Sequence, residues 1–325
     1  MTAARGPRGG RLQLSSGLLP LAALLCAALV VPACRCGDAP GPVTVEYVQP
    51  LREANAEDAG AEAEGSTATN DVRVVEAKGR VEVKRGTAVD WREIKAGDRL
   101  GETDSVRTGD DSRLELELAD IRVTVEERSE LRVREVTETV LRAAFRGRVE
   151  SRVTEDRGNE LELQVDGTDT TLRTTGGEFK VNADGKGTVA VATVSGKVDF
   201  TARGRTVTVA KGEVSHQSGE GGPEAPRPAL QRVMLSVQWP GTKETNLERV
   251  PVRGVVEVGS RVRVQGQYVQ VDGKGRFTAM VPLKQGEQKV AVVATDVLGR
   301  RAQEETQLRV DRRAPTVDRE NRPWE

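Results

Sequence analysis

A strict alternation of apolar and polar residues is the feature that most constrains how this 325-residue chain folds. Residues 114–118 read Leu-Glu-Leu-Glu-Leu, with every apolar side chain two positions from the next. Successive side chains of a β-strand point to opposite faces, so this pattern is typical of half-buried strands. The same period recurs in three further runs: 121–125, 131–134 and 161–165. Glycine- and aspartate-rich turn signals separate the runs, and the nearest approach to helical spacing, 140–149, is weakened by Gly147. The sequence therefore predicts an all-β chain.

Proline placement divides this β-rich sequence into two domains. No proline occurs from Leu51 through Gly222, and prolines resume at Pro223. Proline cannot donate a hydrogen bond to a β-ladder, so the proline-free block fits one continuous strand-rich domain. After Pro228, short valine-rich segments alternate with glycine turns, which favours a second, small β-sandwich of roughly 80 residues.

The first 33 residues are typical of a secretory leader. Residues 1–11 contain three arginines and no acidic residue, and an apolar run follows from Leu18 to Val31. This run is shorter than the roughly 20 residues that a membrane-spanning helix needs. Residues 31–34, Val-Pro-Ala-Cys, resemble the bacterial lipobox, in which a small residue precedes the cysteine that receives the lipid. We therefore predict that Cys34 is the lipidated (palmitate-bearing) first residue of the mature chain. An ordinary cleavable signal and an uncleaved anchor helix are the alternatives, and both also export the chain.

These patterns together predict six parts of the chain: a leader over 1–33, a lipidated cysteine and flexible tether over 34–70, a β domain over 71–216, a linker over 217–228, a β-sandwich over 229–311 and a tail over 312–325.

Cysteine usage and charge exclude several classes of function. All three cysteines, Cys26, Cys34 and Cys36, precede the expected β domains, which therefore hold neither a disulfide nor a thiolate metal site. The formal net charge is −1, the charges are interleaved in sign, and aromatic residues make up 3% of the chain. Nucleic-acid binding needs a concentrated basic face, so we expect no nucleic-acid partner. The sequence contains no cofactor motif, so we expect no cofactor.

No set of residues predicts catalysis or metal binding. His216 is the only histidine, which excludes a multi-histidine site, and we expect it in an exposed loop. Glu115 and Glu117 share a strand face as paired carboxylates do, but no groove or desolvating partner is visible in the sequence, so we expect a solvated outer face. Asp184 and Asp272 each precede a glycine, which favours hairpin turns over calcium sites.

For Trp91 and for a run of four arginines, a structural role is expected rather than ligand binding. Trp91 is expected to anchor the core rather than to form a ligand platform. The basic stripe of Arg142, Arg146, Arg148 and Arg152 is diluted by nearby glutamates, which favours a solvated face over binding to anionic lipid or peptidoglycan.

A weak internal repeat links the two ends of the first domain. Gly79-Arg80-Val81 is followed by a glycine turn, and Gly196-Lys197-Val198 is followed by another. The repeat suggests two similar β-layers.

The first domain resembles the FecR domain of bacterial envelope proteins over about residues 71–216. The resemblance is carried by motifs in a fixed order: Gly79-Arg80-Val81, Trp91, 96–100, 104–109, Ser112, 145–149, 172–179 and 196–198. Residues of 229–311, such as Gly266, Phe277 and the segment 294–299, resemble the immunoglobulin-like modules of bacterial surface proteins. The resemblance implies a FecR-like β domain followed by a small immunoglobulin-like β-sandwich.

The resemblance also implies a place in the cell envelope. The family's named member relays a signal to a sigma factor through a cytoplasmic segment, but only 17 residues precede the apolar run here, too few for such a module. We expect a non-catalytic, lipid-anchored envelope protein that presents β-domains to a protein or peptidoglycan partner. The alternative is a FecR-like regulatory or sensor component that acts through a transmembrane partner. A cell-wall hydrolase is disfavoured, because nucleophilic and metal-binding residues are missing. Arg35 follows the lipidated cysteine, where an aspartate would favour the inner membrane, so the periplasmic face of the outer membrane is preferred.

Mass spectrometry of the mature N-terminus tests the lipid anchor. We expect a peptide that begins at acylated Cys34 in membranes of the native bacterium, and we expect Cys34→Ala to abolish it. An intact N-terminus near Met1 would contradict lipidation and return transmembrane signalling to first place.

Overall fold

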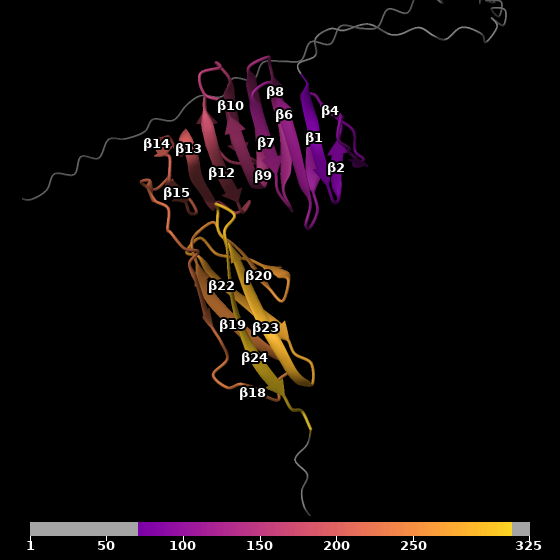
Figure 1. Ribbon diagram of the computed structural model, residues 1–325, viewed down its shortest axis with the longest axis vertical. Coiled ribbons are helices and arrows are strands. Elements are labelled where there is room, and N and C mark those ends of the chain that lie inside the picture. The colour runs from indigo at the N-terminus through magenta and orange to yellow at the C-terminus, as the bar shows by residue number, and fades with distance from the viewer. Residues whose placement is uncertain (1–70, 314–325) are drawn as a thin grey trace, which may run out of the picture. The chain divides into compact units, whose positions relative to one another are not determined.

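The computed structural model describes residues 71–313, which form strands, turns and irregular segments without a helix (Figure 1). This confirms the predicted all-β fold class. Within that range, accordingly, no helix is long and apolar enough to cross a membrane. The leader, Cys34, the tether and residues 314–325 of the tail lie outside the described residues.

Strands β1 to β16 form the first domain as two layers, named A and B, that share two long strands. Layer A consists of β1 (Val72–Lys78), β4 (Arg99–Leu100), β6 (Arg113–Leu118), β7 (Ile121–Val125), β12 (Gly177–Ala183), β15 (Glu213–Gln217) and β16 (Arg227–Pro228). Layer B consists of β2 (Val81–Lys84), β3 (Arg92–Glu93), β5 (Ser105–Thr108), β8 (Glu130–Val136), β10 (Glu160–Val165), β11 (Thr171–Thr174) and β14 (Arg205–Ala210). The shared strands are β9 (Val140–Val153) and β13 (Val189–Ala202), and only the β9–β10 pair is parallel.

The shared strands change layer at glycines. β9 pairs with β8 up to Arg146 and with β12 from Gly147 onward. β13 likewise leaves β12 at Gly196 and pairs with β14 from Lys197. Both glycines have positive φ, +95° at Gly147 and +66° at Gly196, a region that residues with a Cβ rarely adopt. Gly79, with φ +77°, lies between β1 of layer A and β2 of layer B, so the two glycines of the sequence repeat occupy equivalent positions.

The corner at Gly147 is closed by a serine. A Cβ at Gly147 would lie 2.4 Å from Ser129 Oγ and 2.8 Å from its Cα. The backbone N–H of Arg148 donates to that hydroxyl oxygen at 2.8 Å, and the hydroxyl donates to the carbonyl oxygen of Glu127 at 3.0 Å. Glycine is therefore needed at this corner for space as well as for its φ.

The corner at Gly79 repeats the same arrangement. A Cβ there would lie 2.5 Å from Ser112 Oγ. The N–H of Arg80 donates to this oxygen at 2.9 Å, and the hydroxyl donates to the Asp110 carbonyl oxygen at 2.9 Å. The two corners are thus local copies of one motif.

Alternation in sequence becomes alternation in burial. In β6, the three leucines are buried and the polar residues between them are partly exposed. A single core lies between layers A and B, and it includes Phe145, Phe179 and Phe200, each 1% exposed or less. Trp91 is a correction to the expectation: it is half-buried, outside the core, and the guanidinium of Arg107 lies 4.3 Å from its ring centroid.

The second domain is a sandwich of two small sheets. One sheet has the order β17 (Leu235–Gln238), β19 (Arg249–Val256), β22 (Arg276–Pro282). The other has the order β18 (Glu244–Thr245), β24 (Arg301–Val310), β23 (Gly286–Thr295), β20 (Arg261–Val264), β21 (Gln267–Val269). Its core is formed by valines from both sheets together with Phe277 of β22. In the stretch expected to be a linker, β16 returns to the first domain and pairs with β15.

Replacing Gly147 by alanine tests the corner against a matched glycine. Gly204 also has positive φ, +71°, but a Cβ there meets nothing within 4 Å. Both substitutions should lose about 1–2 kcal/mol to backbone strain. Gly147→Ala should lose about 1–3 kcal/mol more, because its methyl group overpacks against Ser129. Urea unfolding of the full chain, followed by circular dichroism, measures the difference, and equal losses would contradict the closed corner.

Candidate functional site

The second domain docks onto the corner turn of the first, defined as Glu127–Ser129. The guanidinium of Arg261, on β20, donates from Nη1 to the Glu127 carbonyl oxygen at 3.0 Å. Its Nη2 lies 3.5 Å from Ser129 Oγ, the hydroxyl that closes the Gly147 corner. The contact between the domains is therefore built on the same residues that let β9 change layer.

A charged cluster around Glu127 strengthens this junction. Arg263 Nη2 lies 2.6 Å from Glu127 Oε2 and 3.0 Å from Asp111 Oδ1. The Tyr268 hydroxyl donates to the other Glu127 carboxylate oxygen and accepts from Arg263 at 2.6 Å. Burial, and then the hydrogen bond to Glu127, raise the pKa of Tyr268 to about 12. The phenol thus stays protonated and keeps donating.

Two cations lie over the ring of Tyr268. The guanidinium carbons of Arg128 and Arg263 lie 4.6 and 4.3 Å from its centroid. Cation–π contacts of this kind contribute about 0.5–2 kcal/mol each, depending on solvent exposure. The ring therefore helps to hold both arginines at the junction.

Arg148 crosses the junction from the first domain. It is 6% exposed, and its Nη2 donates to the Val297 carbonyl oxygen at 2.9 Å. Its Nε is buried without a hydrogen-bond partner among the residues that the structure describes. Arg148 is therefore a buried contact residue, which corrects its assignment to a solvated basic stripe.

Close backbone contact completes the junction on the β12–β13 side. Asn182 Nδ2 donates to the Gly259 carbonyl oxygen at 2.7 Å. A Cβ at Gly259 would lie 2.1 Å from the Cβ of Ala190, so only glycine fits there. Ala190 belongs to a small apolar cluster that also includes Val214 of the first domain and Val297 of the second. Polar and apolar contacts together hold the two domains.

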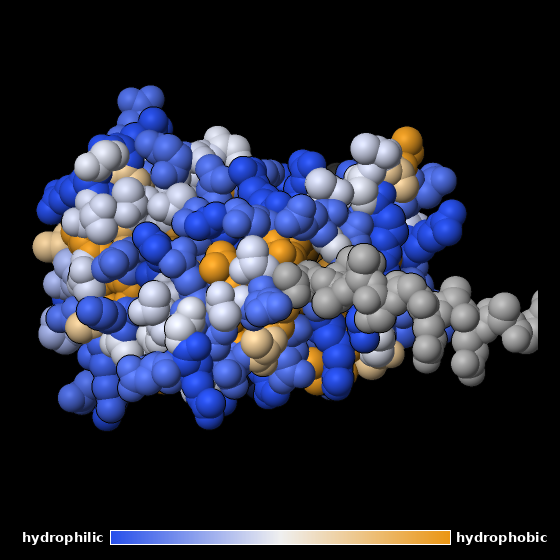
Figure 2. All heavy atoms as spheres, turned by 90° about the horizontal axis from the view of Figure 1, so that it is seen from above, coloured by the Kyte–Doolittle hydropathy of each residue, from blue (hydrophilic) through white to orange (hydrophobic). Residues whose placement is uncertain are grey.

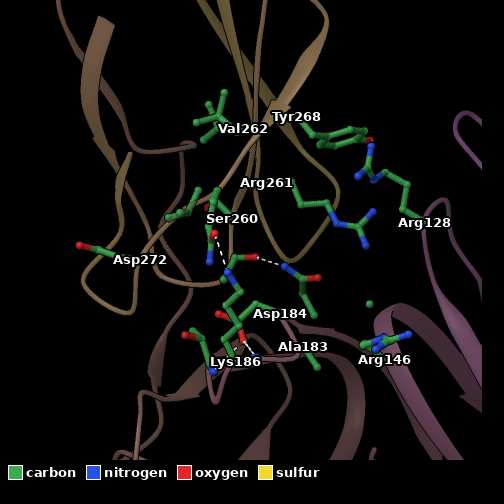
Figure 3. A pocket seen from close by; sticks show the side chains of 17 residues that line it. Arg128, Arg146, Ala183, Asp184, Lys186, Ser260, Arg261, Val262, Tyr268 and Asp272 are labelled. Atoms are coloured by element: carbon green, nitrogen blue, oxygen red, sulfur yellow. Dashed lines mark hydrogen bonds between the residues drawn. The ribbon is translucent and has the colours of Figure 1, made fainter. Parts of the chain in front are cut away.

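Two clefts lie at this junction, one on each side of Arg261. The first has a volume of about 310 Å³ and is lined by Arg128, Arg146, Lys186 and Ser260, among others (Figure 3). The second has a volume of about 350 Å³ and is lined by Arg148 and Arg301, among others. Sequence reasoning did not find this site, because its residues come from distant turns and strands.

The expected outer-face carboxylates are paired with arginine. Glu115 and Glu117 lie side by side on β6, and Arg122 contacts them at 3.1 and 2.8 Å respectively. The hydrogen bond that Arg122 donates to Glu117 is the main cause that raises the pKa of Arg122. Two carboxylates held by one cation are poorly suited to sharing a proton.

The arginines of the expected stripe are divided by the fold. Arg142 contacts Glu135, Arg146 contacts Glu130 at 2.9 Å, and Arg152 contacts Glu178 at 2.6 Å. These pairs lie on outward faces, in keeping with the mostly hydrophilic surface in Figure 2, where apolar residues form small separate groups. Of these four arginines, Arg148 alone is buried at the junction, whereas Arg146 is exposed and lines the first junction cleft.

His216 does not lie where the sequence predicted, whereas Asp184 and Asp272 lie in turns as predicted. His216 lies in β15 rather than in an exposed loop; its side chain is 14% exposed, and Nε2 is 3.0 Å from Glu224 Oε2. Asp184 Oδ1 accepts the backbone N–H groups of Lys186 and Thr188 at 2.7 and 2.9 Å, which makes it the turn residue predicted.

Asp272 forms the second predicted turn. Its Oδ1 accepts the backbone N–H groups of Lys274 and Arg276, each at 2.9 Å. Among residues 71–313, no three histidine, cysteine or acidic side chains come together as metal ligands do.

Comparison with known proteins identifies both domains. Residues 104–215 match the family model FecR protein, and residues 234–312 match the model glucodextranase, domain B. No curated protein matches the chain in sequence.

Solved structures give more distant likenesses. Two crystal structures of a candidate anti-sigma factor from Parabacteroides distasonis are 17% and 16% identical, with TM-scores of 0.34; each match covers 38% of this chain and 59% of the other. This chain thus spans little more than half of those proteins. A polysaccharide lyase is 11% identical over 74% of this chain and 40% of its own, with a TM-score of 0.18. From the two family models, we conclude that the chain carries a FecR domain followed by an immunoglobulin-like domain.

Proposed function

We propose that this chain is a regulatory component of envelope signalling, and that it acts by binding rather than by catalysis. The match of residues 104–215 to the FecR model carries this proposal, because FecR-like proteins are regulators associated with the membrane and its partners. It favours the regulatory alternative over the presentation of β-domains that the sequence suggested first. Function is assigned here by family, so the proposal needs its own test.

The contacts at the junction support a route by which binding to one domain affects the other. A partner bound to the immunoglobulin-like domain can influence the corner turn, because Arg261 and Arg263 of that domain contact Glu127. The corner turn is bonded to β9, which belongs to both layers of the FecR domain. A partner transmits a signal along this route only if it binds the docked and undocked arrangements with different affinity. A transmembrane partner would carry the signal onward.

The proposed place of action is the periplasmic face of the outer membrane. In this proposal, acylated Cys34 holds the chain at the membrane, and residues 35–70 set the reach of the FecR domain. The ion pairing of Glu115 and Glu117 with Arg122 supports a role without catalysis.

Glu127→Gln should loosen the junction. The substitution weakens the contacts of Glu127 with Arg263 and Tyr268, for a loss of about 1–2 kcal/mol at this partly exposed site. Hydrogen exchange of amides 259–263 should then be faster by about 5- to 30-fold. Glu178→Gln is the matched control: its side chain is 22% exposed against 23% for Glu127, and it pairs with Arg152 inside the first domain. Equal exchange in both variants would show that the cluster does not hold the domains.

A deletion strain tests the regulatory proposal itself. Loss of the gene should change transcript levels of envelope genes, and wild-type protein and Glu178→Gln should restore them. Glu127→Gln should restore them only in part, because its domains are held together less tightly. Unchanged transcription, with loss of a wall or envelope protein attachment instead, would overturn regulation in favour of the presentation of β-domains.

A further inference from the structure

The first junction cleft gathers positive charge from both domains. Arg146 and Lys186 contribute from the FecR domain, and Arg261 contributes from the immunoglobulin-like domain (Figure 3). Arg128, on the corner turn, lies at its edge beside Tyr268 (Figure 3). Four cationic side chains therefore surround a space of about 310 Å³, which lies within the size range of small-molecule sites.

Two of these cations contact no carboxylate in the part of the chain that the structure describes. Lys186 Nζ donates to the neutral amide oxygen of Gln270 at 2.7 Å. Arg261 donates to a carbonyl oxygen and approaches the Ser129 hydroxyl. Burial, and then repulsion by Arg148, lower the pKa of Arg261, so its charge is unfavourable where it stands. A bound anion would relieve both costs.

The remaining two cations are held only weakly. Arg146 and Glu130 are 59% and 37% exposed, and Arg128 and Asp110 are 52% and 68% exposed. Exposed pairs of this kind contribute about 0–1 kcal/mol each. Arg146 is therefore free to turn toward a ligand at little cost, whereas Arg128 would also have to leave the ring of Tyr268.

The carboxylates that line the cleft do not neutralise it. Asp184 is occupied by the two backbone N–H groups of its turn. Asp272 is likewise occupied, and the side chain of Arg276 holds its second oxygen at 2.8 Å. Both aspartates keep their negative charge, but four cations line the cleft against these two, so an excess of positive charge remains.

A buried hydroxyl offers a further polar contact. Ser260 lines the cleft and is 5% exposed, and its Oγ has no hydrogen-bond partner within the described residues. Unsatisfied buried polar atoms are uncommon in folded proteins and call for an explanation. A ligand oxygen, or a water bridging to one, would satisfy this hydroxyl.

We propose that this cleft binds an oxyanion group, a phosphate or a carboxylate, and that the bound group holds the two domains in their docked arrangement. Arg146 and Lys186 contact it from one side, and Arg261 and Ser260 contact it from the other. The side chains that contact the anion come from both domains, so the site exists only while the domains are docked. Binding of the anion therefore stabilises the docked arrangement.

Calorimetric titration of the full chain with inorganic phosphate, and separately with acetate, tests the cleft. Sodium chloride at equal ionic strength serves as the reference. Lys186→Gln and Arg146→Gln should each raise the Kd about tenfold, since each loses one charge-assisted hydrogen bond. Both side chains are exposed, so these variants should fold, and thermal unfolding without ligand confirms it.

Two controls replace residues that do not line the cleft. Lys211→Gln removes an exposed lysine in the β14–β15 turn, and Arg203→Gln removes an arginine whose pair with Asp169 is similarly exposed. Both should bind as the wild type does. Binding of phosphate alone or of acetate alone, lost in the cleft variants, supports the site and identifies the group. No heat beyond that of chloride, or equal weakening in the controls, overturns it.

This inference does not depend on the regulatory role. A failed titration leaves the transcription test standing, and unchanged transcription leaves the binding result standing.

Discussion

The close approach of Gly147 to Ser129 is the contact on which most of this structure depends. It lets β9 pass from layer B to layer A, and so joins the layers over one core. The serine hydroxyl then fixes the turn whose outer side receives the second domain through Arg261. A larger residue at position 147 would therefore disturb the FecR domain and its junction together.

Buried and half-buried arginines make most of the directional contacts at the junction. Apolar contact at the junction is limited to a small cluster around Ala190 and Val297, so guanidinium groups supply much of the specificity. Arg148 and Arg263 fix the register of the domains by directional hydrogen bonds. Complementary charges at an interface contribute to specificity more than to raw affinity.

Much of the fold could be predicted from local pattern. The leucines of β6, the turns at Asp184 and Asp272 and the second sandwich followed from alternation and turn chemistry. The repeat at Gly79 and Gly196 marked two of the corners. The corner at Gly147 carries the same Gly-Arg-Val triplet as Gly79, a signal that the sequence held and that the repeat analysis missed.

The sequence by itself determined the β class, the order of the two domains and the positions of their turns, because these depend on neighbours in the chain. Only the tertiary structure decided which polar residues are buried. Arg148 differs little in sequence from Arg146, yet one is 6% exposed and the other lies on an outward face. Regular alternation would place these two residues, two positions apart, on the same face of β9. They differ because the strand changes layer at Gly147, which lies between them, and because Arg148 donates to Val297 of the second domain.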